Sequence, residues 1–525
     1  MTAFLESIGY NGWILPVLLA LPLLGSVALF ARAGSTASAD EKMAADRRLA
    51  FWIFIAEAAL SLGLWWSVDT ASPDWQAAVK LPWIPAWGVT FHVGLDGIAL
   101  MLVLLTTLLM PLAVLGGWTS VREKTASYYG LLLILTTGML GVFMALDLVL
   151  FYVMWEVMLV PMYLIIGIWG GQRRLYASLK FFLYTMIGSL LMLVAVIWLG
   201  LATQKGGVPN FSYDAILELS RTGAFSGSIW LFSAFAIAFA VKVPMFPFHT
   251  WLPDAHVEAP TAGSVILAAI MLKMGTFGFV RFAVPLFPMA AMDPRVRTVM
   301  LVLAVVGIVY GALVALVQPD FKKLVAYSSV SHLGFVMLGI FAMTVESVQG
   351  ALVVSISHGV STGALFLLIG MIYERRHTRL VDDFGGIAKV MPIFSAFLTI
   401  VALSSIGVPG TNGFVGEFLV LIGSFPTQPV YTVIAATSVI FAAAYMLWAV
   451  QRIIYNPLVK PENLALKGMD LNWREIGLLV PLVIAILWIG VYPKPILQKT
   501  EAAAERLVRT VWSAPVSDPS QARGY

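Results

Sequence analysis

The amino-acid sequence predicts an all-α polytopic membrane protein with about 14 transmembrane helices and two inverted five-helix repeats, each containing a broken helix. Hydrophobic residues make up 60% of the 525 residues and charged residues only 11%, whereas soluble domains carry about 25% charged residues. The apolar residues fall in runs of about 20, the length that crosses the hydrocarbon core of a bilayer. Proline-containing breaks beside intramembrane charges interrupt two of these runs.

The expected spans follow the apolar runs in chain order. Only Asp147 separates the fourth span from the fifth, and a Gly-Val-Pro-Gly stretch breaks the twelfth. The first span is expected to be a retained helix, because Glu6 is the only early charge and a signal peptide has a positive leading region. The predicted spans are residues 13–30, 49–68, 95–118, 128–146, 148–168, 179–201, 228–248, 261–280, 296–317, 324–343, 350–373, 390–424, 430–450 and 476–491.

The distribution of lysine and arginine predicts the orientation of the chain. These residues concentrate in the loops that follow odd-numbered spans. Cytoplasmic loops carry the excess of positive charge, so both termini are expected on the periplasmic side. The acidic segment 253–258, interpreted as a solvated loop, and the basic loop 281–297 depart from this pattern. Lys322 and Lys323 are interpreted as a cytoplasmic anchor.

A weak internal repeat divides the chain. The Val-Pro pair at Val243 and Pro244 resembles the pair at Val408 and Pro409, and each pair precedes a phenylalanine by a few residues. This match pairs spans 4–8 with spans 9–13, and an odd number of helices places the second copy upside down. Coincidence between two proline breaks is the alternative. The predicted divisions are an N-terminal three-helix segment (1–126), two five-helix half-channel repeats (127–285 and 286–455) and a C-terminal helix with a tail (456–525).

Six ionisable residues lie inside predicted spans and are the candidate site. An ionisable side chain within a membrane is costly and marks an ion or proton path by default. Structural hydrogen bonding is the alternative for each carboxylate and each lysine, and burial as a neutral core residue is the alternative for each histidine. Serine and threonine hydroxyls near the histidines can hold waters that join such groups into a proton wire. The candidates are Glu156, Lys242, Lys273, His332, His358 and Glu417.

Glu156 and Lys242 are predicted to act as a switchable pair. Burial disfavours the charged form of a lysine, and a neighbouring carboxylate restores it. Separating the two groups would therefore convert Lys242 from a holder of a proton into a donor. The chain has no cysteine, which excludes disulfides and thiolate ligation of an iron–sulfur cluster. It also lacks a Gly-x-Gly-x-x-Gly fingerprint and a Walker-type loop.

Two stretches carry a resemblance to a known family. The stretch from Trp251 through His256 to Lys273 is similar to the signature shared by complex I and Mrp-type antiporter subunits, and residues 326–335 resemble the complex I version. Glu417 matches subunit M, where the related subunits L and N typically carry lysine. The chain therefore resembles the antiporter-like subunit M (mitochondrial chain 4) of proton-translocating NADH:quinone oxidoreductase, respiratory complex I.

The resemblance implies a role for each candidate residue. Glu156 and Lys242 would be the modulating ion pair of the first half-channel, and Lys273 the central relay. His332 and His358 would connect the halves, and Glu417 would be the terminal group of the second half-channel.

The resemblance also implies the surroundings of the chain. It would hold no cofactor, and NADH, FMN, iron–sulfur clusters and quinone would bind to partner subunits of the membrane and peripheral arms. It would lie in the bacterial inner membrane beside other antiporter-like subunits, without contact to nucleic acid. A subunit of a multi-subunit Na⁺/H⁺ (Mrp-type) antiporter and the membrane subunit of a related hydrogenase are the alternatives.

Overall fold

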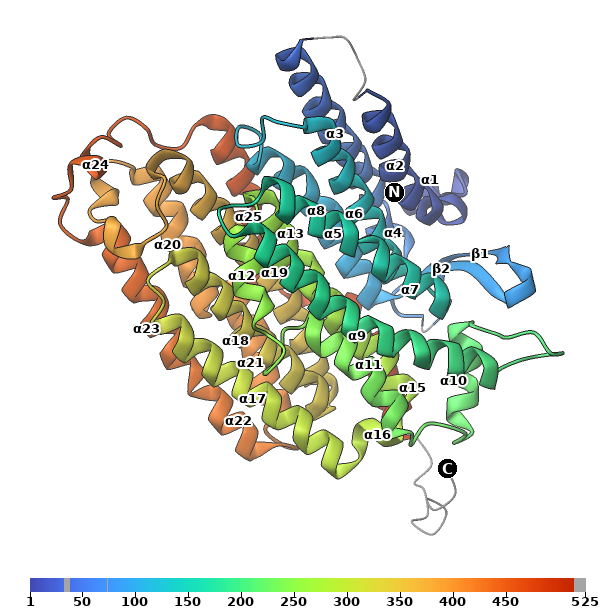
Figure 1. Ribbon diagram of the computed structural model, residues 1–525. Helices are drawn as coiled ribbons and strands as arrows, with labels where there is room; N and C mark the ends of the chain where they lie inside the picture. The colour runs from blue at the N-terminus through green and yellow to red at the C-terminus, as the bar shows by residue number, and fades with distance from the viewer. Residues whose placement is uncertain (33–37, 73, 514–525) are drawn as a thin grey trace.

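The chain folds into an almost wholly helical bundle, with a β-hairpin projecting from one side (Figure 1). The computed structural model describes residues 1–32, 38–72 and 74–513. Twelve helical segments in this part are long and apolar enough to cross a membrane. They include most of the predicted spans, so the prediction of an all-α polytopic membrane protein is confirmed. The predicted span 228–248 contains a single helix that ends at Lys242, and the predicted span 390–424 is split into two helices; the exact count of 14 stays a prediction.

The N-terminal region wraps one edge of the bundle. The hairpin between α4 and α5, which the sequence reading did not predict, is antiparallel, with Val79 opposite Val93 and Leu81 opposite Phe91. Gly88 closes its turn with a φ of +67°, and a Cβ there would lie 1.7 Å from the Pro209 carbonyl oxygen. The elements are α1 (Thr2–Ser7), α2 (Tyr10–Arg32), α3 (Ala39–Leu62), α4 (Leu64–Ser67), β1 (Gln76–Ile84), η1 (Pro85–Trp87), β2 (Val89–Leu95) and α5 (Gly97–Gly116).

The next group of helices contains the first helix break, which follows Lys242 at the end of α11. Asp147 caps α7 by accepting from the backbone amides of Val149 and Leu150, which separates the fourth predicted span from the fifth. The elements are α6 (Thr125–Met144), α7 (Leu148–Val157), α8 (Leu159–Trp169), α9 (Arg174–Ala202), α10 (Tyr213–Arg221), α11 (Ile229–Lys242), α12 (Trp251–Glu258), α13 (Thr261–Ile266), η2 (Leu267–Met271), α14 (Leu272–Gly278), η3 (Phe279–Ala283), α15 (Val284–Leu286) and α16 (Pro288–Met292).

The third group contains the second break, between α20 and α21. Gly407 and Gly410 adopt φ values of +82° and +91° there, which residues with a side chain rarely adopt. The elements are α17 (Pro294–Leu316), α18 (Phe321–Ala342), α19 (Val345–Arg376), η4 (Val381–Asp383), η5 (Ile387–Lys389), α20 (Pro392–Ile406), α21 (Asn412–Ser424), α22 (Pro429–Ala436), α23 (Ser438–Val450), η6 (Gln451–Tyr455) and α24 (Pro461–Leu464).

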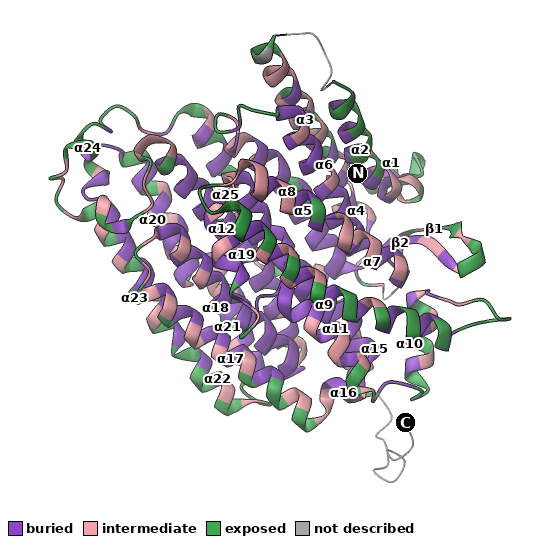
Figure 2. Cartoon of the chain, in the orientation of Figure 1, coloured by how far each residue is buried: buried purple, intermediate pink, exposed green. Residues whose placement is uncertain are grey.

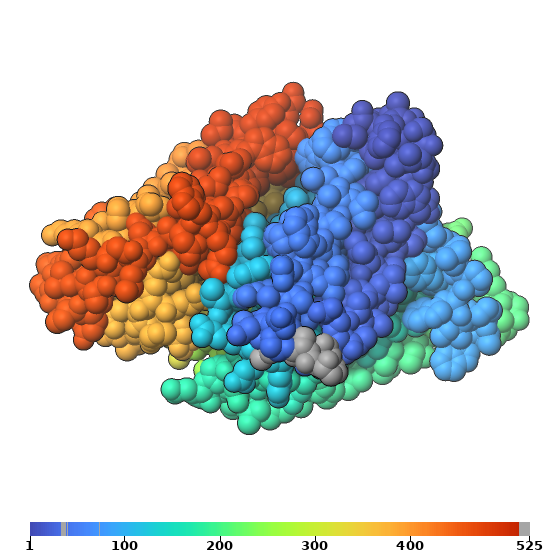
Figure 3. Space-filling view, turned by 90° about the horizontal axis from the view of Figure 1, so that it is seen from above, coloured from blue at the N-terminus to red at the C-terminus, as the bar shows by residue number. Residues whose placement is uncertain are grey.

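Two C-terminal helices complete the described chain, α25 (Trp473–Val491) and α26 (Lys494–Trp512). The sequence predicts one helix and a tail for residues 456–525, so α26 is an additional helix. It packs against α5 and α19. Seen from above, the N-terminal helices and the C-terminal segments lie beside each other on the same face (Figure 3).

Burial separates a protein-facing centre from a lipid-like surface (Figure 2). The stretch from α13 to α15, together with α18 and α19, is almost completely buried, whereas most of α9 and α25 is not. The outward residues of α9 are nevertheless large and apolar, among them Leu183, Ile187 and Val194. An apolar exterior of this kind suits hydrocarbon, and the buried central helices carry Lys273, His332 and His358, three of the six predicted site residues.

Candidate functional site

Four of the predicted site residues lie in one buried row. The Nζ atom of Lys273 on α14 lies 2.6 Å from Nδ1 of His358 on α19. Nδ1 of His332 on α18 lies 2.7 Å from Oε1 of Glu417 on α21. The two imidazole rings meet edge to face, with centroids 5.7 Å apart and an interplanar angle of 60°. Four separate helices thus bring an amine, two imidazoles and a carboxyl group into a continuous arrangement.

A local distortion of the helix positions Lys273. Residues Leu267–Met271 form one π-helical stretch, which leaves backbone carbonyls without their usual helical partners. The Nζ atom of Lys273 donates to the Ala268 carbonyl oxygen at 2.5 Å. With this bond made, the second contact of the amine lies towards His358. The π-helical stretch therefore orients the lysine into the row.

The two histidines each have one ring nitrogen available for a further contact. Nε2 of His332 and Nε2 of His358 are buried and have no hydrogen-bond partner among the described residues. Both rings line a cavity of about 20 Å³, together with Glu417 and hydroxyl-bearing residues of α19 and α20. A polar cavity of that size holds about one water molecule. A water there would bridge the two imidazoles, which otherwise lie too far apart for a direct proton transfer.

Asn412 at the break between α20 and α21 organises the far end of the row. Its Oδ1 accepts from Ser404 at 2.5 Å and from Ser361 at 3.0 Å. Its Nδ2 donates to the Ser357 carbonyl oxygen, and Ser357 donates back to the Asn412 carbonyl oxygen. These bonds link the first residue of α21 to the middle of α19. They also fix α21, which carries Glu417, against α19, which carries His358.

The first predicted pair has a different geometry. Lys242 is the last residue of α11 and is buried, and its Nζ has no hydrogen-bond partner in the part of the chain that the structure describes. It lies 5.5 Å from the ring centroid of Trp155 and 5.4 Å from that of Phe181. Glu156 on α7 instead has the Tyr152 and Ser189 side chains as neighbours. Glu156 and Lys242 lie near each other, but no ion pair joins them among the described residues.

Close helix packing brings Lys242 towards the row. A Cβ at Gly275 would lie 2.8 Å from the Phe239 carbonyl oxygen and 2.9 Å from the Val243 amide nitrogen. The absence of a side chain at Gly275 therefore lets α14, which carries Lys273, pack directly on the end of α11. No polar contact in the described chain connects the two amines, so a proton would need water or a side-chain movement to pass between them.

The segment 253–258 is helical and largely buried, so its interpretation as a solvated loop is wrong. Pro253 lies in the first turn of α12, where a missing amide hydrogen costs no helical hydrogen bond. Asp254 pairs with Lys180 at 2.7 Å, and Glu258 accepts from the Arg173 amide. The ring of His256 is fully buried and stacks on Phe366, with centroids 4.7 Å apart.

The interpretation of Lys322 as a cytoplasmic anchor is wrong as well. Lys322 is buried and donates to the carbonyl oxygens of Ala259 at 2.7 Å and Val257 at 3.4 Å. It therefore satisfies carbonyl groups at the C-terminal end of α12. In the described residues, no group of three or more His, Asp or Glu side chains is arranged to hold a metal ion.

Sequence reasoning missed three structural contributors near the site: Asn412, His256 and Lys322. Asn412 could have been found, because an amide beside a helix break inside an apolar run is unusual. His256 and Lys322 gave a weaker signal, since their partners lie elsewhere in the sequence.

The bundle with its buried row defines the class of multi-span, antiporter-like membrane proteins. Residues 145–442 match the family described as "NADH:quinone oxidoreductase/Mrp antiporter, TM". The chain belongs to this family and, within it, to the NADH-quinone oxidoreductase subunit M and NADH-ubiquinone oxidoreductase chain 4 proteins.

Individual relatives cover nearly the whole chain. An NADH-quinone oxidoreductase subunit M of Rhodobacter capsulatus is 44% identical over 91% of this chain and 93% of its own length. An NADH-ubiquinone oxidoreductase chain 4 of Chondrus crispus is 41% identical over 90% of this chain and 94% of its own.

Solved structures agree with this fold. A chain of respiratory complex I from Thermus thermophilus is 33% identical, with a TM-score of 0.83 over 95% of this chain and 99% of its own. A chain of the Mrp complex from Dietzia has a TM-score of 0.79 at 21% identity, over 95% of this chain and 52% of its own. The second likeness shows a common fold alone.

Proposed function

We propose that this chain is a proton-translocating membrane-arm subunit of an NADH:quinone oxidoreductase. It moves protons across the membrane while other subunits transfer electrons from NADH to quinone. The observation that carries the proposal is the buried row from Lys273 through His358 and His332 to Glu417. Buried ionisable groups with this spacing can pass a proton along hydrogen bonds and one intervening water. The named relatives support the same activity.

Each residue has a proposed role in the transfer. Lys273 accepts a proton from the direction of Lys242 and passes it to His358. His332 receives it and delivers it to Glu417, beside the break. Glu156 controls the charge of Lys242: when the carboxylate approaches, the lysine keeps its proton, and when it withdraws, the proton moves towards Lys273. In the present arrangement the two groups lie near each other, but no ion pair joins them among the described residues.

The proposed topology is that of two inverted repeats. The first half-channel comprises residues 127–285 and the second residues 286–455, flanked by the segments 1–126 and 456–525. Helix breaks after Lys242 and before Glu417 support the correspondence of the two repeats. The excess of lysine and arginine after odd-numbered spans supports periplasmic termini in a bacterial inner membrane.

The proposed partners are neighbouring antiporter-like subunits and the peripheral subunits of the same complex. Relatives named as subunits M and a matching chain within complex I support a multi-subunit assembly. The partners would hold the NADH, FMN, iron–sulfur and quinone sites, since this chain has no cysteine to ligate a cluster.

A Lys273→Met variant of the purified complex tests the function directly. In proteoliposomes with NADH and quinone, we expect proton pumping to be lost and electron transfer to slow, because the row loses its amine. Lys205→Met is the matched control, since Lys205 lies exposed in a loop. Normal pumping by Lys273→Met would refute the role of the row.

The second candidate function is ion exchange in an Mrp-type antiporter, because the matching family includes such subunits. Purification of the native complex distinguishes the two. Co-purifying subunits with flavin and iron–sulfur spectra support the oxidoreductase, whereas small antiporter subunits and sodium-dependent exchange without NADH support the alternative.

A further inference from the structure

A groove of about 410 Å³ lies between α11 and α17, and no residue of the row lines it. Buried side chains such as Phe232 and Met300 form its floor, and Val299 is exposed at its margin. Apart from Ser233 and Arg295, the side chains that line it are apolar. Since α17 is long and apolar enough to span a membrane, the groove presents an apolar surface to the bilayer.

The short helix α16 connects the starts of the two helices. The backbone amide of Ala290 on α16 donates to the carbonyl oxygen of Ser226, just before α11, at 3.0 Å. α16 ends at Met292 and α17 begins at Pro294, so the two lie next to each other (Figure 1). Beyond this connection α11 packs against α9 and α14, whereas α17 packs against α18 and α23. The two helices thus pack into different halves of the protein, and the groove remains between them.

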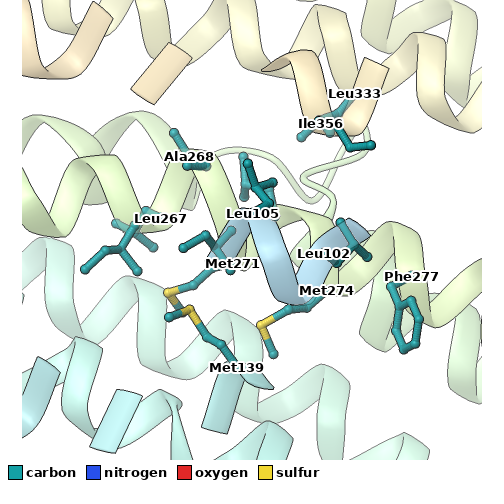
Figure 4. Close-up of a cluster of buried hydrophobic side chains, with 14 of the residues drawn as sticks. Leu102, Leu105, Met139, Leu267, Ala268, Met271, Met274, Phe277, Leu333 and Ile356 are labelled. Atoms are coloured by element: carbon teal, nitrogen blue, oxygen red, sulfur yellow. The ribbon is translucent and has the colours of Figure 1, made fainter. Parts of the chain in front are cut away.

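The groove differs from the apolar interior of the protein, which its own side chains fill. Figure 4 shows Leu105, Met139, Met271 and Met274 lying together in one such buried cluster. Protein interiors of this kind are packed as densely as organic crystals. Water gains no hydrogen bonds from the apolar walls of the groove, so it does not fill the space. In a membrane, the hydrocarbon chains of lipids are the material that does.

The two ends of the groove differ in polarity. Ile229 and Arg295, near the starts of α11 and α17, line one end, and Trp230 beside them is 86% exposed. Tryptophan and arginine are typical of the interface between hydrocarbon and water. Met245 and Phe248, in the helix break beyond α11, line the other end. The groove therefore runs from the membrane interface towards the middle of the bilayer, as a phospholipid does.

Arg295 offers a positive charge at the polar end of the groove. Two other arginines of the basic loop 281–297 have partners within the protein. Arg281 pairs with Asp96 at 2.6 Å, and Arg297 donates to two carbonyl oxygens at the end of α18. The guanidinium group of Arg295 is exposed and has no hydrogen bond or ion pair among the described residues. A guanidinium group binds phosphate oxygens through paired hydrogen bonds.

We propose that this groove binds one glycerophospholipid of the surrounding membrane. One acyl chain lies between α11 and α17, and Arg295 binds the phosphate group. The far end of the chain contacts Met245 and Phe248, so the lipid lies against the helix break that follows Lys242. The site requires only that these helices lie in a membrane, and it does not depend on the proposed proton pumping.

A phospholipid with a diazirine near the end of one acyl chain tests the site in the intact complex. The purified complex is reconstituted with this lipid, extracted again in mild detergent to remove loosely held lipid, and irradiated. Peptide mass analysis should find the label on the segment that contains Met245 and Phe248. The exposed face of α9, which includes Ile187, should carry little label, because it has no groove to retain a lipid.

Two variants separate the phosphate contact from the apolar contact. Arg295→Gln should reduce the label about tenfold, because a hydrogen bond between charged groups contributes more than a neutral one. Arg221→Gln is the matched control and should leave the label unchanged, since Arg221 is an exposed arginine at the end of α10 that does not line the groove. Ser233→Trp fills the groove from its half-exposed margin and should abolish the label while Arg295 is still present.

Three results would overturn the proposal. Equal labelling of the Arg295→Gln complex would show that Arg295 binds no phosphate. Equal labelling by a diazirine-bearing fatty alcohol or isoprenoid quinone, neither of which has a phosphate, would make the groove a general apolar site. An unlabelled groove in the unmodified complex would show that another subunit covers this face or that no lipid is retained there.

Discussion

The two ends of the proposed proton path, at Lys242 and at Glu417, differ in the contacts that surround the ionisable side chain. Glu417 contacts His332 directly and lies beside a break that Asn412 and its serine partners stabilise. Lys242 instead lies near two aromatic rings, and within the described ranges its amine has no hydrogen-bond partner. The Glu417 end of the proposed path is therefore already connected by hydrogen bonds. In the proposed mechanism, the Lys242 end acquires its connection through water or through movement of Glu156.

The largest effect is expected at the connected end. Glu417→Gln keeps the shape of the side chain but removes its ability to bind and release a proton. We expect pumping in proteoliposomes to be abolished and NADH–quinone turnover to fall at least about tenfold, as transport and electron transfer are coupled. Glu417→Asp should retain much of both activities. Equal pumping by the Gln variant would show that no proton passes through this carboxyl group.

Lys242→Arg probes the disconnected end. Arginine keeps the positive charge above Trp155 but cannot release a proton, so the complex should assemble and not pump. Lys467→Arg, at an exposed position, is the control. Lys242→Ala and Glu156→Gln should each remove most pumping, and the double variant should lose little more, as expected for residues that act together. If the Lys242→Arg complex pumped normally, Lys242 would have a structural role as a cation and no role in proton transfer.

Much of the candidate site could be predicted because charges stand out in apolar sequence. The four residues of the row were identified individually, and both helix breaks lie where proline and glycine interrupt the runs. The contacts between them could not be predicted. The bond from Lys273 to Ala268 depends on a π-helical stretch that sequence periodicity does not reveal. The burial of His256 depends on Phe366, far away in the chain.

The fold, like the site, could be predicted only in those parts that have a clear sequence pattern. Long apolar runs define the spans, because their length must match a bilayer. The hairpin β1–β2 and the helix α12 were missed, since both are short and mix polar with apolar residues. In each case tertiary packing decided the local structure.

Asn412→Ala should produce an intermediate effect at the connected end. The change removes acceptors and donors for Ser361, Ser404 and the Ser357 carbonyl group. Each lost buried hydrogen bond costs about 1 kcal/mol, which is close to a fivefold change in an equilibrium. We expect pumping to fall several-fold while the complex still assembles. Asn463→Ala, a buried asparagine outside the row, is the comparison. Equal effects of both variants would reduce Asn412 to a packing residue.

His358→Ala should slow pumping only in part. Removal of the ring leaves Lys273 with its bond to Ala268 and enlarges the small cavity beside Ser357 and Ser361. Water can enter a polar cavity of sufficient size and replace the missing link. Turnover and pumping, measured together, should fall by a similar factor. Unchanged rates would indicate that His358 is a core residue, and complete loss would show that water does not replace it.

The smallest effect on transport is expected at Asp96, which stabilises the far end of the Lys273-bearing stretch. Asp96 pairs with Arg281 at 2.6 Å and with Arg506 at 3.1 Å, and it caps α5. Burial by itself would raise the pKa of Asp96, but the two guanidinium groups and the Ala99 amide hold it below its usual value.

A carboxyl group with a lowered pKa stabilises the folded chain above its unfolded pKa of about 4. This contribution is lost as the pH falls through the lower, folded pKa. Asp96→Asn should therefore reduce the free energy of unfolding at neutral pH by about 3 kcal/mol. We expect a lower thermal denaturation temperature of the complex as a result. The difference between the variant and the unmodified complex should shrink as the medium becomes strongly acidic. Proton pumping per electron should be unchanged, because the pair contacts neither Lys242 nor the row. A reduced ratio of protons to electrons in Asp96→Asn would show that this ion-paired end moves during transport, which would extend the moving part of the first half beyond Glu156 and Lys242.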